Sequence, residues 1–147
     1  MMRWVGAFLL VAAVAATGVL FPPGAWYQGL LKPAFNPPNW LFAPVWTLLY
    51  IFMAVVLARR WPSPDRQWRL PFFLQLAANA AWTPLFFGAH LMALALADIA
   101  FLFAAIFWLL RVLHPTDRLS FWLMLPYALW VGFALLLNAT LLWLNSA

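Results

Sequence analysis

The sequence has no cysteine and very little charge. Only 7% of its 147 residues are Asp, Glu, Lys or Arg, whereas a typical soluble domain carries about 25%. Without cysteine the chain has no disulfides, no thiolate metal ligands and no cysteine nucleophile. So few charges could not cover the surface of a soluble domain of this size, and the natural solvent for the chain is therefore the hydrocarbon of a membrane.

The sequence also lacks the usual constellations of enzyme active sites. It contains no nucleophile–base pair, no paired carboxylates and no phosphate-binding loop. His90 and His114 are its two histidines, and each stands alone at the edge of an apolar run. Neither has a partner at metal-ligand spacing, and neither is deep enough to be an axial haem ligand within a helical bundle. These absences predict no metal site, no required cofactor and no conventional catalytic residues. They argue against an enzyme but leave the question open.

What the sequence has in excess is apolar and aromatic side chains. Hydrophobic residues make up 68% of the chain, and 11 residues are tryptophan. The apolar residues form five runs of about the 20 residues that a membrane-spanning helix needs. We therefore predict one all-α domain, residues 1–147, that is an integral membrane bundle of five transmembrane helices. The predicted spans are 4–21, 40–58, 70–87, 91–113 and 119–144.

The amino-terminal run and the loop after it allow further readings. Arg3 precedes the first run, and small residues occur around 13–17, so a signal peptide is an alternative for this segment. The loop 22–39 is rich in proline and glycine. Within it, Trp26 and Tyr27 with the leucines that follow could form one amphipathic turn at the membrane interface.

The net charge of +5 is distributed unevenly among the connections. Basic residues lie in short gaps between apolar runs, so they predict membrane topology rather than binding of nucleic acid. Five spans place the amino terminus and the second and fourth loops on one side, and Lys32 is the only lysine or arginine on the other. The positive-inside rule then predicts a cytoplasmic amino terminus. The residues on the basic side are Arg3, Arg59, Arg60, Arg66, Arg69, Arg111 and Arg118.

Three of the predicted spans each carry a stripe of aromatic and polar residues on one helical face. Amide side chains facing lipid would be unsatisfied, so these three faces should meet in the interior. One interpretation is a packed core, in which amides bridge helices at about 0.6 kcal/mol per hydrogen bond. The other is a cavity for a flat apolar ligand. The stripes are Phe42, Ala43, Trp46 and Tyr50; Gln75, Asn79, Trp82 and Phe86; and Tyr127, Trp130, Ala134, Leu137 and Asn138.

Asp98 is the only carboxylate well inside a predicted span. An ionised carboxylate is costly to bury in a membrane, so this group should be paired, protonated or near water. A structural hydrogen bond between helices is favoured over a role in ligand binding or proton transfer.

Three stretches of the sequence resemble the TspO/MBR family, the tryptophan-rich sensory proteins related to the mitochondrial translocator protein. The first is WYQGLLKPAFNPPNWLFAPVWTLLY from Trp26. The second is NAAWTPLFFG from Asn79, with ALAD ending at Asp98, and the third is PYALW from Pro126, running on to LLLN at Asn138. Together they cover most of the chain in the family's order.

The resemblance implies a five-helix membrane bundle, often a homodimer, that binds porphyrins such as protoporphyrin IX or haem. It also implies a sensory, regulatory or transport role and, from the short tail, a bacterial cell membrane. The ligand would lie among the helices with loop 22–39 as a lid, and membrane lipid would surround the bundle. By motif matching the pocket tryptophans would be Trp46 and Trp130, with Ala43, Tyr50, Asn79, Trp82, Ala134, Leu137 and Asn138 as neighbours. The helical faces add Phe86 and Tyr127.

Two further implications of the resemblance stay open. Some members are reported to promote light- and oxygen-dependent breakdown of protoporphyrin, which would make Trp46 and Trp130 redox-active groups of an enzyme. Animal members bind cholesterol through a motif that ends in a basic residue. Here the tail ATLLWLNSA has none after Arg118, so the resemblance leaves open whether this chain binds sterol.

Overall fold

The computed structural model describes residues 1–146, and all regular secondary structure in these residues is helical. Five of its helices are long and apolar enough to cross a membrane, which confirms the predicted fold class. The long helices and the two short elements are α1 (Met2–Leu20), α2 (Ala25–Gly29), α3 (Asn39–Arg60), α4 (Arg69–Thr83), η1 (Pro84–Gly88), α5 (Met92–Thr116) and α6 (Arg118–Leu144).

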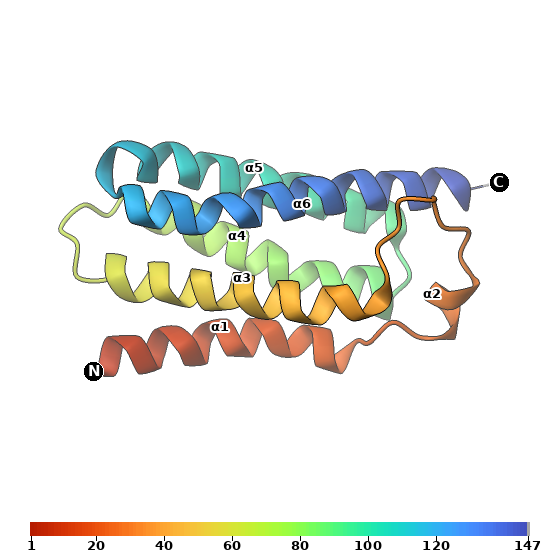
Figure 1. Cartoon of the computed structure of the whole chain (residues 1–147), viewed down its shortest axis with the longest axis horizontal. Coiled ribbons are helices and arrows are strands. Elements are labelled where there is room, and N and C mark those ends of the chain that lie inside the picture. Colours follow the sequence, from red (N-terminus) through yellow and green to blue (C-terminus); the bar gives the residue numbers. More distant parts are fainter. Residues whose placement is uncertain (147) are drawn as a thin grey trace.

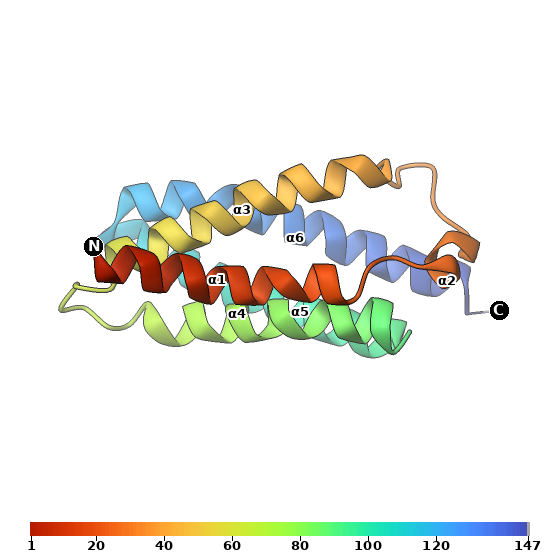
Figure 2. The same cartoon turned by 90° about the horizontal axis from the view of Figure 1, so that it is seen from below.

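Successive long helices run in opposite directions, so the bundle has two ends (Figure 1). The basic end holds the amino terminus and the α3–α4 and α5–α6 connections. The loop end holds α2, the η1–α5 connection and the carboxyl end of α6. Figure 2 shows α3 diverging from α1 and α4 toward the loop end. The arrangement gathers the arginines of the predicted basic side at one end.

The helix bounds differ from the predicted spans chiefly near prolines. Helix α5 extends through Thr116 and includes Pro115, since a proline in the last turn forfeits only one hydrogen bond close to the water interface. Helix α4 passes into the π-helical turn η1 at Pro84, which has no backbone N–H to continue the α-helical ladder. The chain then reverses at His90, whose φ of 59° is unusual for a residue other than glycine.

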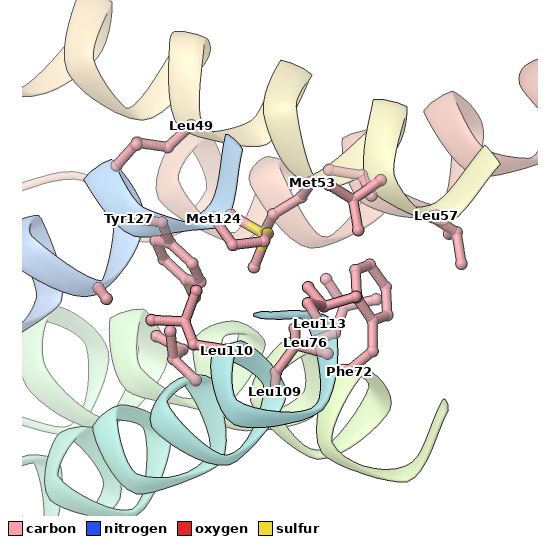
Figure 3. Packing of buried hydrophobic residues seen from close by; sticks show 14 of the residues in the cluster. Leu49, Met53, Leu57, Phe72, Leu76, Leu109, Leu110, Leu113, Met124 and Tyr127 are labelled. Carbon is pink, nitrogen blue, oxygen red and sulfur yellow. The ribbon is translucent and has the colours of Figure 1, made fainter. Parts of the chain in front are cut away.

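The main apolar core lies in the half of the bundle nearer the basic end, and Figure 3 shows how its side chains pack. Side chains from α3, α4, α5 and α6 meet there, among them the fully buried Met53, Phe72, Leu109 and Met124. A second, smaller core lies at the loop end, where Tyr27 of α2 packs with Phe86 of η1 and with side chains of α5 and α6. The aromatic and polar faces predicted for α3, α4 and α6 contribute side chains to both cores and to the region between them.

Asp117 fastens the connection between α5 and α6 at the basic end. Its carboxylate accepts hydrogen bonds from the backbone N–H of Ser120 at 3.2 Å and from the Ser120 hydroxyl at 2.7 Å. It also pairs with Arg59 of α3 at 3.4 Å. Burial acts to raise the pKa of Asp117, but the bonds from Ser120 and the charge of Arg59 outweigh it, and the pKa lies below its usual value. Asp117 is therefore an N-cap for α6 that also contacts α3.

Candidate ligand site

A chain of buried hydrogen bonds links α3, α4 and α6 at the centre of the bundle. The Tyr50 hydroxyl donates to Asn79 Oδ1 at 2.8 Å. Asn79 Nδ2 donates to the Tyr127 hydroxyl at 2.9 Å, and this hydroxyl donates to Gln75 Oε1 at 2.9 Å. The sequence placed these four residues on inward faces, and the structure joins them into one network. Asn79 of α4 thus bridges to α3 and α6, as the packed-core interpretation expects.

A second polar link lies nearer the loop end. Trp82 Nε1 donates to Asn138 Oδ1 at 3.1 Å, and Asn138 Nδ2 donates to the carbonyl of Met92 at 3.2 Å. The Trp82 ring also stacks on Phe86, with centroids 4.9 Å apart and planes inclined by 16°. The Asn138 amide therefore holds α4, α5 and α6 together, and its polar atoms already have partners within the protein.

Trp46 forms an aromatic wall with the two tyrosines of the network. Its ring centroid lies 5.4 Å from that of Tyr50 and 6.2 Å from that of Tyr127. Tyr127 is fully buried, whereas Trp46 and Tyr50 are partly exposed. The two tyrosines of the wall are thus held by hydrogen bonds, whereas the indole of Trp46 is partly accessible.

Trp130 continues the wall along α6 toward the loop end. Its ring lies 5.8 Å from Phe42 of α3 and 5.7 Å from Phe133 of α6. Phe35, in the first loop, reaches the edge of Phe133 at 6.3 Å. Trp130 and Ala134 are partly buried and Ala43 is exposed. The wall therefore begins at the central network and ends beneath the first loop.

Three buried polar atoms near the bundle centre have no hydrogen-bond partner among residues 1–146. They are Trp130 Nε1, Gln75 Nε2 and Asp98 Oδ2. The predicted bond between helices is thus not made by this oxygen of Asp98. Because buried polar groups are normally paired, each such atom calls for an explanation. Trp130 Nε1 is the one that belongs to the aromatic wall, so it can donate to a bound molecule there.

The first loop is docked on η1 through α2. Tyr27 is buried against Phe87, with centroids 5.3 Å apart, and Trp26 stacks on His90 at 4.1 Å. Burial raises the pKa of Tyr27, and its hydrogen bond to Asn36 only partly offsets this. The aromatic turn predicted at the membrane interface therefore packs against protein, which supports a covering position for the loop.

Lys32 secures the same loop from within. Its ammonium donates to the carbonyls of Tyr27 at 2.6 Å, Gln28 at 3.1 Å and Leu30 at 3.2 Å. It also lies 4.7 Å from the centroid of the Tyr27 ring. Among residues 1–146, the only lysine or arginine at the loop end is thus engaged at the carboxyl end of α2, where a cation is favourable.

The site residues predicted from the sequence separate into two groups in the structure. Trp46, Tyr50, Asn79, Tyr127 and Trp130 share the central network and the wall. Trp82, Phe86, Leu137 and Asn138 lie in or beside the loop-end core with Tyr27. The sequence did not single out Phe35 or Phe133, and it considered His90 only as a metal or haem ligand. Phe133 lies three residues after Trp130, a helical spacing that could have identified it, whereas the contacts of Phe35 and His90 depend on how the chain folds back.

Two hollows of the described chain lie outside this wall. One is a groove between α5 and α6 at the basic end, and the other follows the exposed side of α1.

Comparisons with known proteins agree with the sequence resemblance. Residues 7–144 match the TspO/MBR family. The chain is 36% identical to the tryptophan-rich protein TspO of Archaeoglobus fulgidus, over 99% of this chain and 98% of the relative. It is 37% identical to the tryptophan-rich sensory protein of Cereibacter sphaeroides, over 90% and 85% of the two chains. It is 35% identical to the human translocator protein, over 77% and 70%.

Proposed function

The chain belongs to the TspO/MBR family, and on that premise we propose that it binds a flat hydrophobic tetrapyrrole between α3 and α6. The ligand would be protoporphyrin IX or a haem-type porphyrin, and the protein would act in sensing, regulation or transport. The names of its relatives, a sensory protein and a translocator protein, support such a role. The observation that carries the proposal is the buried, unpartnered Nε1 of Trp130 within the aromatic wall.

The wall offers the two kinds of contact that a planar macrocycle needs. The indole faces of Trp46 and Trp130 supply stacking, at about 0.5–1.5 kcal/mol per aromatic pair beyond the burial of area. Trp130 Nε1 supplies a donor in a low-dielectric setting. Asn79 and Asn138 hold the helices in place through their own hydrogen bonds. They shape the site without contributing a free polar atom.

Entry of the ligand would involve the first loop. Phe35 touches Phe133, which in turn lies beside Trp130. Displacing Phe35 would expose the end of the wall that faces the loop end. The loop would thus act as a lid whose position responds to the ligand, and this is the coupling that a sensory or transport role requires.

Titration of the purified protein with protoporphyrin IX in detergent, followed by the shift of the porphyrin absorption band in the dark, tests the proposal. We expect Trp130→Phe to weaken binding by about fivefold, since one neutral hydrogen bond contributes about 1 kcal/mol. Trp46→Ala should weaken it further through loss of stacking. Trp143→Phe is the matched control, because Trp143 lies on the same helix and is 77% exposed. Equal affinity in the wild type, Trp130→Phe and Trp46→Ala would refute the site.

A further inference from the structure

A groove with a volume of 360 Å³ lies between α5 and α6 at the basic end. Its walls are apolar, formed by Phe107, Leu110, Phe121 and Leu125. Phe107 is 55% exposed, so the groove opens on the outer surface of the bundle. Figure 1 shows α5 and α6 running side by side into the connection that closes this end. The volume falls within the roughly 300–1,000 Å³ of small-molecule sites.

Basic side chains gather where this groove reaches the basic end. Arg111 and His114 belong to its lining, and both are exposed. Within residues 1–146, Arg111 has no carboxylate at ion-pair distance. Its guanidinium carbon lies 6.0 Å from the centroid of the Phe107 ring, so the charge stands directly beside the apolar wall.

His114 is held in a fixed setting by its neighbours. Arg118 Nη1 lies 3.3 Å from His114 Nε2, and the edge of Phe121 meets the imidazole ring at 5.0 Å. Asp117, the carboxylate next to Arg118 in sequence, is engaged with Ser120 and Arg59. The charge of Arg118 is therefore not compensated by that neighbour.

We propose that this groove binds one anionic phospholipid. Its phosphate would lie among Arg111, His114 and Arg118, and an acyl chain would follow Phe107, Leu110 and Leu125. Arginine matches the geometry and charge of a phosphate, and basic pockets between transmembrane helices are a known setting for anionic headgroups. A free phosphate would make no use of the apolar walls, and a zwitterionic lipid would leave part of the positive charge uncompensated. Charge and shape together thus select an anionic lipid.

The proposal differs from a simple excess of positive charge at one end of the bundle. A topology signal depends on the number of arginines, whereas a binding site depends on their placement. Arg66 provides the matched control, because it is exposed in the α3–α4 connection at the same end and its side chain makes no hydrogen bond among residues 1–146. Removing it lowers the net charge by one, as removing either Arg111 or Arg118 alone does, but leaves the groove intact.

Native mass spectrometry of the full chain in detergent tests the proposal. Phosphatidylglycerol and phosphatidylcholine with identical acyl chains are added together, and the retained lipid is counted. We expect retention of one phosphatidylglycerol in preference to phosphatidylcholine. An arginine near a headgroup is worth about fivefold in affinity, so Arg111→Gln with Arg118→Gln should reduce retention about 25-fold. Arg66→Gln should change it less than about twofold, given the screening of a distant charge.

A second variant separates the groove from the charges, and circular dichroism confirms that each variant folds. Leu125→Trp fills the groove while preserving all arginines, and it should lower retention of phosphatidylglycerol several-fold. Added inorganic phosphate should not displace the lipid. The proposal is overturned if Arg66→Gln weakens retention as much as the double variant, or if wild type shows no preference between the lipids. It is also overturned if Leu125→Trp has no effect or if inorganic phosphate displaces the lipid, which would indicate a site for free phosphate.

Discussion

The side chain of Asn145, at the carboxyl end of α6, pairs with the backbone of Leu31 in both directions. Its Oδ1 accepts from Leu31 N at 2.9 Å, and its Nδ2 donates to the Leu31 carbonyl at 3.0 Å. An amide side chain thus takes the place of a neighbouring strand for one residue of the first loop. Together with Lys32 and the docking of Tyr27, this pair fixes the loop over the loop end of the bundle.

Replacing Asn145 by Ala should loosen the first loop without unfolding the bundle. The substitution removes the two hydrogen bonds to Leu31, of about 1 kcal/mol each, and the bond from Asn145 Nδ2 to the Leu141 carbonyl of the same helix. The two bonds to Leu31 lie in an exposed setting, where water replaces them in part. We expect amide exchange at Leu31 to accelerate by about tenfold, which corresponds to about 1.4 kcal/mol of local stability. Hydrogen–deuterium exchange measured by mass spectrometry reads this out on the peptide that contains Leu31.

Thr140→Ala serves as the control for the loop experiment. Thr140 lies on the same helix, and its hydroxyl bonds only to the Leu136 carbonyl of that helix, at 2.8 Å. Its removal should leave exchange in the first loop unchanged. Similar acceleration in both variants would mean that the Asn145–Leu31 pair does not hold the loop.

Replacing Tyr127 by Phe should destabilise the bundle more than replacing Tyr50 by Phe. The Tyr127 hydroxyl accepts from Asn79 and donates to Gln75, so its removal leaves two buried amides short of a partner. The Tyr50 hydroxyl makes one bond, to Asn79. Bonds between membrane helices average about 0.6 kcal/mol, so we expect a loss of about that size for Tyr50→Phe and at least twice that for Tyr127→Phe.

The measurement for the two tyrosine variants is thermal unfolding in one detergent, followed by helix content. The substitutions are matched, since each deletes one hydroxyl and retains the ring. A smaller loss for Tyr127→Phe than for Tyr50→Phe would contradict the network as described.

Replacing Asp117 by Ala should lower stability in a way that depends on pH. The folded protein holds the pKa of Asp117 below its usual value, so the carboxylate contributes stability above the pKa of the unfolded chain, about 3.9. This contribution is lost as the pH falls through the lower pKa of the folded state. Loss of the N-cap should cost about 1 kcal/mol at neutral pH.

The measurement is the unfolding midpoint of the wild type and of Asp117→Ala at a series of pH values from neutral to acid. The difference between the two proteins should be largest at neutral pH and narrow as the pH falls. Thr116→Ala is the control, because its hydroxyl bonds only to the Val112 carbonyl within α5, at 2.8 Å. Its effect should be smaller and the same at each pH. A pH-independent difference for Asp117→Ala would exclude the charged N-cap.

The orientation in the membrane can be tested because the chain has no cysteine. Ser63→Cys places a single thiol in the α3–α4 connection at the basic end, and Ser146→Cys places one at the loop end. The excess of arginine at the basic end predicts that this end is cytoplasmic. In intact cells a membrane-impermeant maleimide should then label Ser146→Cys but not Ser63→Cys, and the reverse pattern would invert the orientation.

The amino-acid sequence by itself determined the residence of this chain in a membrane, its five spans and its three polar faces. Hydropathy and helical periodicity are local properties, so length and spacing suffice to read them. The inward positions of Gln75, Asn79, Tyr127 and Asn138 followed in the same way, because an unsatisfied amide is costly against lipid.

Only the tertiary structure decided which polar groups meet and which remain unpaired. Asn79 bonds to two tyrosines and Asn138 to Trp82, while Trp130 Nε1 keeps no partner among residues 1–146. Such pairings depend on the rotation and axial shift of each helix relative to its neighbours. These are determined by the packing of the whole bundle. The same holds for Asn145 and Leu31, which are 114 residues apart in the chain and meet only because α6 ends beside the first loop.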